Sequence, residues 1–300
     1  MVYGWFAPYL LPSIIAYALS FIALIVGSIT DLRTREVPDW INYGLITSGI
    51  GLNLLFSVIY SNPSFVINSI IGLIIFFGIA YIMFYAGQWG GGDSQMLMGL
   101  GAMLGIDVSS IPNQFLLGFL INALLIGAIY GLLWSVLLVF KNKKKFWSEF
   151  KKILSERDAV KSKKIILFGL ILLSTIFLFF NSNLIRLMAL TLALLIIITF
   201  YLWIFVKAVE KSCMYKSVEP SKLTEGDWIV RNVYVAGKYI TGPKDLGIRK
   251  SQIAKLVKFY KRKQVEKILI KEGIPFVPSF LMAFIATFIY GNFIALFFRI

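Results

Sequence analysis

The sequence predicts an all-α polytopic membrane protein with about eight transmembrane helices and a small mixed α/β cytoplasmic subdomain. Of its 300 residues, 58% are hydrophobic, and the mean hydropathy is +0.80, which is more apolar than soluble domains normally are. The apolar residues gather in runs of about 20, the length that crosses the hydrocarbon core of a bilayer as a helix. Between residues 40 and 140 only two side chains carry a formal charge.

The first apolar run is interpreted as a membrane helix and not as a signal peptide, because it lacks a basic n-region and is followed by further spans. The fourth run is the weakest span, since it is short and carries three glycines. The predicted spans are residues 10–30, 42–60, 65–86, 94–108, 114–139, 164–181, 184–206 and 276–297.

The distribution of basic residues predicts an N-terminus outside the cell. With that orientation, the inside segments 31–41, 140–164 and 207–275 hold 2, 10 and 16 of the 30 Lys and Arg residues. Because cytoplasmic loops are enriched in Lys and Arg, this orientation is strongly favoured. It places Asp31 and Asp93 at the same, cytoplasmic, face of the cell membrane.

The same pattern divides the chain into five parts. Short strands are expected around residues 227–230 and 234–238, and a basic helix is expected from Arg249 to Lys271. The parts are an N-terminal bundle (1–140), a basic cytoplasmic link (141–163), a transmembrane hairpin (164–206), a cytoplasmic subdomain (207–275) and a C-terminal helix (276–300).

Composition excludes several kinds of site. The chain has no histidine and one cysteine, Cys213, so histidine-based catalysis, disulfide pairing within one chain and clustered Cys/His zinc sites are excluded. We expect no metal or organic cofactor. The formal charge of +15 is interpreted as an orientation signal that contacts anionic lipid, and no nucleic acid partner is expected.

Two carboxylates stand out because burying a charge near a membrane is costly and therefore suggests function. Asp31 closes the first apolar run, and Asp93 follows the glycines Gly90, Gly91 and Gly92. If the two meet across the helix bundle, they can share a proton and hold a water molecule for peptide hydrolysis. The glycines permit close backbone approach of a substrate strand.

Simpler explanations exist for each residue alone. Asp93 after glycines suits a helix N-cap, and Asp31 beside Arg33 and Arg35 suits a juxtamembrane charge. Asp107 is expected to be a loop or cap residue at the opposite face. The joint placement of Asp31 and Asp93 on one face favours a catalytic pair over these explanations.

Three segments carry a resemblance to a known family. Residues 31–40, with the sequence Asp-Leu-Arg-Thr-Arg-Glu-Val-Pro-Asp-Trp, and residues 90–102, which begin Gly-Gly-Gly-Asp, resemble the type IV prepilin peptidases, which are GxGD-type intramembrane aspartyl proteases. Residues 272–281 and 223–227 are similar to the archaeal branch that includes the preflagellin peptidases.

The resemblance implies that Asp31 and Asp93 are the catalytic residues of an aspartic endopeptidase. It implies that the enzyme removes the short basic class III leader of type IV pilin-like or archaellin precursors at the cytoplasmic face. The precursor's apolar helix would remain in the mature subunit. Nothing in the sequence indicates the oligomeric state.

The chain departs from the family pattern at three places. The cysteine-rich zinc domain of many bacterial members is absent, so their methyltransferase activity is not supported. Gln95 stands where a lysine commonly follows the GxGD aspartate by two positions. Residues 141–206 form an insertion relative to the shorter preflagellin enzymes, and this favours pilin-like substrates.

Two other functions fit part of the pattern. A presenilin-like protease would share the GxGD motif, but the C-terminal Pro-Ala-Leu motif of those families is missing. A cation-coupled transporter or an assembly scaffold would use the two aspartates as an ion site. Transport favours broken helices in two related halves, which the sequence does not show.

Overall fold

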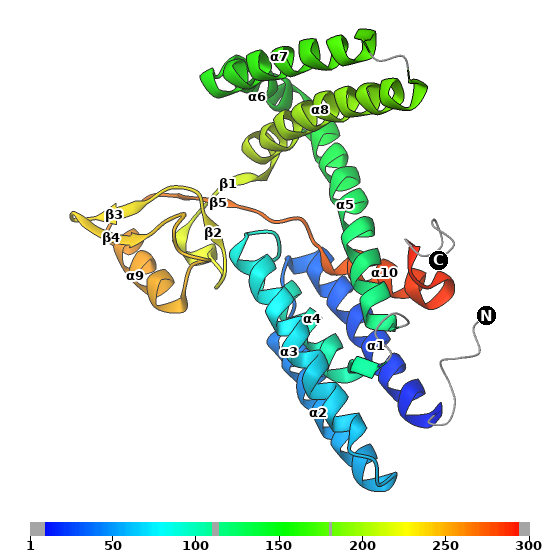
Figure 1. The fold of residues 1–300 in the computed structure, drawn as a ribbon. Helices are drawn as coiled ribbons and strands as arrows, with labels where there is room; N and C mark the ends of the chain where they lie inside the picture. Colours follow the sequence, from blue (N-terminus) through cyan, green and yellow to red (C-terminus); the bar gives the residue numbers. More distant parts are fainter. Residues whose placement is uncertain (1–9, 110–113, 180–181, 294–300) are drawn as a thin grey trace. The chain divides into compact units, whose positions relative to one another are not determined.

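The computed structural model describes residues 10–109, 114–179 and 182–293, and Figure 1 shows their helices and strands. The chain divides into two compact units. The first unit contains residues 1–132, 246–249 and 273–300, and the second contains 133–245 and 250–272.

The first unit is a helix bundle. Its helices begin and end where the local chemistry predicts: Pro38 and Pro63 directly precede two of them, and Arg35, with a φ of 63°, ends the first in the left-handed conformation typical of helix C-termini. The helices are α1 (Leu10–Thr34), α2 (Asp39–Ile59), α3 (Ser64–Tyr85), α4 (Gly91–Leu104), the first part of α5 (Phe115–Lys141) and α10 (Val277–Tyr290).

Six helices among the described residues are long and apolar enough to cross a membrane, as expected of a multi-pass membrane protein. They are α1, α2, α3, α5, α7 (Arg157–Phe179) and α8 (Asn183–Val209). The two other predicted spans are helical but shorter, because α4 and α10 have 14 residues each, or about 21 Å at helical rise. Residues 294–297 of the last predicted span lie outside the described part of the chain.

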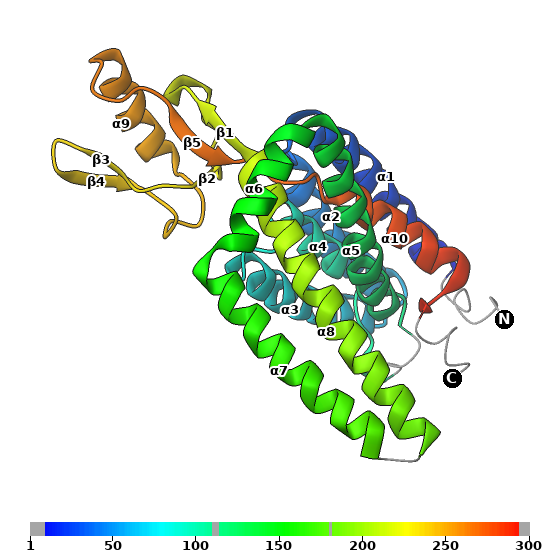
Figure 2. The same cartoon turned by 90° about the horizontal axis from the view of Figure 1, so that it is seen from above.

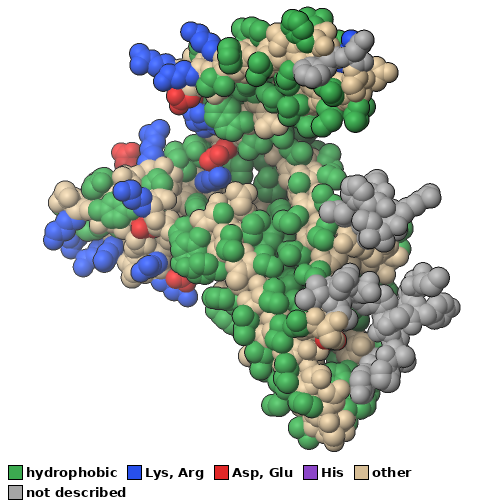
Figure 3. Space-filling model, viewed as in Figure 1, with side chains coloured by type: hydrophobic (Ala, Val, Ile, Leu, Met, Phe, Trp, Pro, Cys, Tyr) green, Lys and Arg blue, Asp and Glu red, His purple; other side chains and the backbone are tan. Residues whose placement is uncertain are grey.

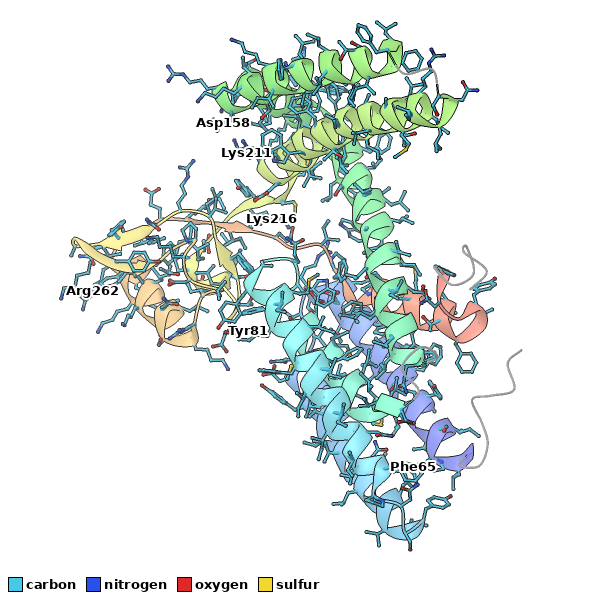
Figure 4. All side chains as sticks on the ribbon, in the orientation of Figure 1. Phe65, Tyr81, Asp158, Lys211, Lys216 and Arg262 are labelled. Atoms are coloured by element: carbon cyan, nitrogen blue, oxygen red, sulfur yellow. The ribbon has the colours of Figure 1, made fainter. Side chains whose placement is uncertain are left out.

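The outer surface of the first unit is apolar. Figure 3 shows hydrophobic side chains covering the face over α2 and α3. Tyr81, labelled in Figure 4, projects outward from α3 and is 52% exposed. In a soluble protein such a surface would favour aggregation, whereas lipid tails solvate it well.

Helix α4 lies inside this bundle, packed against α2 and α3. Met96, Leu97 and Leu100 are completely buried. Glycines allow the close approach: a Cβ on Gly49 would lie 2.7 Å from the backbone nitrogen of Met103, and one on Gly72 would collide with the carbonyl oxygen of Gly101. Such contacts between small residues let helix backbones approach closely in membranes. The shortness and glycine content of α4 therefore reflect burial within the protein.

The carbonyl groups at the C-terminal end of α4 are satisfied by its neighbours. Ser69 on α3 donates its hydroxyl to the Ala102 carbonyl at 2.5 Å, and the Asn53 amide on α2 donates to the Met103 carbonyl at 3.1 Å. The last carbonyls of a helix have no partner within the helix, and burial without one is costly in an apolar bundle. These bonds fix α4 along its axis.

Asn122 joins α5 to α10. Its side-chain amide donates to the Thr287 hydroxyl at 2.9 Å and to the Gly291 carbonyl at 2.8 Å, and its oxygen accepts from the backbone N–H of Phe293 at 3.1 Å. We expect Asn122→Leu to lower the free energy of unfolding by about 1–2 kcal/mol, measured by thermal unfolding in detergent. Thr287→Val removes one of these partners and should cost less; an equal or larger cost would contradict this account.

The helices of the second unit include a long hairpin, in which α7 and α8 lie side by side (Figure 2). Phe146, Ile153 and Ile204 form part of their shared apolar core. Glu156, between α6 and α7, accepts from Lys207 at 2.9 Å and from Lys211 at 3.0 Å. The elements are α6 (Lys143–Ser155), α7 (Arg157–Phe179), α8 (Asn183–Val209) and a π-helical turn (Glu210–Met214).

Two small sheets and one helix complete the second unit. The three-stranded sheet has the antiparallel order β1-β5-β2, with Val218 opposite Ile268 and Ile229 opposite Ile270. β3 pairs with β4 separately. Lys216 on β1 and Arg262 after α9 are labelled in Figure 4. The bounds are β1 (Tyr215–Val218), β2 (Trp228–Ile229), β3 (Val233–Val235), β4 (Lys238–Thr241), α9 (Lys250–Lys261) and β5 (Ile268–Lys271).

The prediction of one helix from Arg249 to Lys271 was wrong in its second half. Helix α9 ends at Lys261, and Lys263 adopts a φ of 57° that turns the chain out of the helix. Ile268 and Ile270 are buried while the residues after each are half-buried, the alternation of a strand. This segment is a strand because it pairs with β1 and β2, and local periodicity does not reveal that pairing.

Candidate active site

Asp31 lies in the last turn of α1 and is 5% exposed. Its Oδ2 accepts a hydrogen bond from the backbone N–H of Val277, the first residue of α10, at 3.0 Å. The backbone N–H of Phe276 also interacts with this carboxyl, as does the positive charge of Arg35. The carboxyl of Asp31 is therefore fixed by a distant part of the chain and is not a solvated juxtamembrane charge.

Asp93 lies in the first turn of α4. Its Oδ2 accepts from the backbone N–H of Gly90 at 2.9 Å. Gly90 is itself the N-cap residue, and Asp93 reaches back to it from the third helical position. The simple explanation of Asp93 as the N-cap was therefore wrong in position, although the side chain does help to cap the helix.

The two aspartate segments are in contact. A Cβ on Gly92 would lie 3.2 Å from the Cβ of Val37, which follows α1, and a Cβ on Gly27 would lie 2.7 Å from the Met96 methyl group of α4. The charge of Asp31 acts electrostatically on the carboxyl of Asp93. Among the described residues no hydrogen bond joins the two carboxyls, and each accepts one from a backbone N–H.

A polar network that was not predicted from the sequence lies beside the glycines. Asn42 on α2 is completely buried, and its amide donates to the Gly92 carbonyl at 3.3 Å and to Gln95 Oε1 at 3.1 Å. The Gln95 amide in turn donates to the Tyr43 hydroxyl at 3.4 Å. A polar side chain within a membrane span is a signal that could have pointed to Asn42.

Tyr130 on α5 was also missed. Its phenol lies within electrostatic range of both Asp31 and Arg35. A tyrosine within an apolar helix has no distinctive sequence signal, because tyrosine is common near membrane interfaces. Tyr130 brings α5 to the same site as α1.

Asp107 is separated from this site by the length of α4. Its Oδ1 accepts from the backbone N–H of Ser109 at 2.9 Å and from the Ser109 hydroxyl at 2.6 Å. This is the geometry of a local loop cap, as predicted. Asp107 therefore takes no part in the arrangement around Asp31 and Asp93.

The site lies within the part of the chain that matches known proteins. Residues 18–132 match the type IV leader peptidase family. The chain is 38% identical over 108 residues to the preflagellin peptidase of Methanococcus maripaludis, which is 36% of this chain and 46% of that protein. It is 40% identical over 90 residues to that of Methanococcus voltae, which is 30% of this chain and 38% of that protein.

A third relative, the preflagellin peptidase of Methanocaldococcus jannaschii, is 36% identical over 110 residues, or 37% of this chain and 46% of that protein. The chain thus spans less than half the length of the curated relatives it matches. The resemblance predicted from the aspartate motifs is confirmed over this segment: residues 18–132 match the type IV leader peptidase family.

Proposed function

We propose that the protein is a membrane aspartyl endopeptidase that removes the basic leader of type IV pilin-like or archaellin precursors. The observation that carries this proposal is the pairing of two carboxylates: Asp31 and Asp93 come from contacting segments, and the charge of one acts on the other. Both lie within the stretch that matches the type IV leader peptidases.

The chemistry follows from two carboxyls that share one proton. The ionised carboxylate takes a proton from a water molecule, whose oxygen attacks the carbonyl carbon of the scissile bond. The protonated carboxyl hydrogen-bonds the carbonyl oxygen, where negative charge develops. Transfer of a proton to the leaving nitrogen completes cleavage to a carboxylic acid and an amine. Asp31 Oδ2 accepts from the Val277 N–H and Asp93 Oδ2 accepts from the Gly90 N–H, so backbone hydrogen bonds hold both carboxyls for these steps.

The proposed substrate class rests on the charge and the location of the two aspartates. The counts of basic residues favour an orientation with both aspartates at the cytoplasmic face of the cell membrane. A class III precursor presents its short basic leader there, directly before an apolar helix that lies in the bilayer. Acidic groups at that face attract the leader electrostatically, so the scissile bond is brought to the carboxylates without leaving the membrane surface.

The second unit is proposed to contact anionic lipid. Figure 3 shows Lys and Arg side chains gathered over the strands and α9. On α6, Phe146 is buried while Trp147 is 55% exposed among exposed lysines. An exposed tryptophan beside lysines suits the headgroup region of a membrane. The positive charge of this unit argues against direct contact with a basic leader.

The face of cleavage can be tested with membrane vesicles of defined orientation. A precursor added outside inverted vesicles, which expose the cytoplasmic face, should lose its leader, whereas right-side-out vesicles should cleave it only after permeabilisation. Cleavage by intact right-side-out vesicles alone would contradict the proposed topology.

The glycines before Asp93 provide a graded test of the site geometry. We expect Gly92→Ala to slow cleavage about threefold to tenfold, because the new Cβ lies 3.2 Å from Val37 and pushes the two aspartate segments apart. Gly44→Ala, in α2, is the control, since its Cβ would meet nothing within 4 Å and Gly44 is not one of the glycines expected beside the substrate strand. Both variants are compared by initial cleavage rates. Equal rates would show that the Gly92 contact does not set the geometry.

A further inference from the structure

The N-terminus of α10 has a partner that is far away in sequence. Its N-cap residue, Phe276, makes no side-chain capping hydrogen bond. The first backbone N–H, that of Val277, instead donates to Asp31 Oδ2 of α1 at 3.0 Å, across 246 positions of the chain. Backbone N–H groups at a helix N-terminus favour a negative charge, both by direct hydrogen bonding and through the helix dipole.

The same end of α10 also contacts the segment that carries Asp93. The Trp89 ring is perpendicular to the Phe280 ring at 5.3 Å between centroids and lies 6.0 Å from the Phe276 ring. Trp89 is 3% exposed and directly precedes Gly90, whose N–H binds Asp93 Oδ2. Packing against α10 therefore fixes the start of the Gly90–Asp93 turn.

Residues 276–280 lie outside the matched stretch of residues 18–132. We infer that the N-terminus of α10 is a third component of the active site, which positions Asp31 through the Val277 N–H and the Asp93 turn through Phe276 and Phe280. This inference rests on the proposed peptidase function. Val277 acts through Asp31 and is a positioning residue, not a catalytic one.

The Val277 N–H acts on the orientation of the Asp31 carboxyl plane. A free aspartate at a helix end samples several rotamers, whereas catalytic groups must be held within about 0.5 Å of their productive geometry. The hydrogen bond from the Val277 N–H to Oδ2, with the Phe276 N–H beside it, restricts the carboxyl to one orientation toward the water and the substrate. Loss of this bond should therefore impair the chemical step more than substrate binding.

A single-atom change tests the bond. Replacing Val277 with its α-hydroxy acid analogue, 2-hydroxy-3-methylbutanoic acid, exchanges the backbone N–H for an oxygen and keeps the side chain. We expect kcat for precursor cleavage to fall about tenfold to a hundredfold, with KM nearly unchanged. Valine installed by the same route is the control. Wild-type kcat in the ester variant would overturn the inference.

Two further variants separate positioning from general damage. The ester also weakens the Phe276 carbonyl as an acceptor, and that carbonyl binds the Ser279 hydroxyl at 2.7 Å. Ser279→Ala removes this bond while the Val277 N–H stays, so it should keep most of kcat. Val277→Ala keeps the N–H and should also cleave, although loss of a fully buried side chain lowers its thermal stability.

A second measurement needs no substrate. Thermal unfolding is compared for wild type, the ester at position 277, Asp31→Ala and the combination of both changes. If the N–H and the carboxyl interact, the ester should lower Tm less in the Asp31→Ala background than in the wild type. Additive changes in Tm would overturn the inference. Failure of the wild type to cleave any precursor would instead overturn the proposed function and leave this coupling measurable.

Discussion

The Asp93→Asn substitution is expected to reduce leader cleavage at least about a thousandfold, because an amide cannot exchange the proton that acid–base catalysis requires. The fold should persist. The substitution is isosteric, and the amide oxygen can still accept the hydrogen bond that Asp93 Oδ2 receives from the Gly90 N–H at 2.9 Å. Asp31→Asn should have the same effect, with its amide oxygen accepting from Val277. The check is the initial cleavage rate per folded molecule, with folding measured by thermal unfolding.

Asp39→Asn is the matched control for both variants. Asp39 is an exposed aspartate at the start of α2, so its substitution removes the same charge near the same end of the bundle. It should cleave at the wild-type rate. Wild-type cleavage activity in Asp93→Asn would rule out the aspartyl protease mechanism. If cation binding required the negative charge at positions 31 and 93, and no precursor was cleaved, an ion site of the kind a transporter uses would be favoured.

The Gly72→Leu substitution is expected to have the largest effect on stability, about 3 kcal/mol or more. At this position α3 and α4 touch through their backbones, and a Cβ would collide with the Gly101 carbonyl oxygen and approach the Gly105 Cα to 3.0 Å. A larger side chain must push α4 out of the bundle, and Asp93 lies at its first turn. We therefore expect poor expression in the membrane, a lowered Tm in detergent and loss of activity together.

Gly78→Leu controls for the substitution itself. Gly78 lies on the same helix, and a Cβ there would meet nothing within 4 Å. Leucine has a better helix propensity than glycine, so Gly78→Leu should fold at least as well as the wild type. Equal destabilisation of both variants would show that the backbone contact between Gly72 and Gly101 does not hold α4 in place.

Much of this fold is predictable because the hydrocarbon core of a membrane restricts the backbone structures that can cross it. A long apolar run can satisfy its backbone groups only as a helix, so six of the predicted spans agree with helices of spanning length. The same rule singles out Asp31 and Asp93, since a carboxylate in an apolar stretch is conspicuous. Asp107 obeys a local rule of turn chemistry, and its role as a loop cap was predictable for that reason.

Other parts of the fold depend on contacts with segments that are distant in sequence, and no local sequence pattern reveals those contacts. Helix α4 has too few apolar residues to span a membrane by itself, and its burial depends on glycines of α2 and α3. Ile268 and Ile270 form a strand because β1 and β2 lie on either side. The contact of Val277 with Asp31 uses a backbone N–H, which every residue except proline has. The sequence therefore singles out the two carboxylates as candidates but does not reveal the backbone groups that bind them.

The proposed function requires that this site cleave a leader peptide and that both carboxylates take part. Its most direct test is mass spectrometry of pilin-like and archaellin-like precursors incubated in membranes with wild type, Asp31→Asn or Asp93→Asn. We expect that wild type alone yields a product shortened by the basic leader, cut just before the apolar helix. Intact precursors with folded wild type, or the same shortened product with either variant, would contradict it.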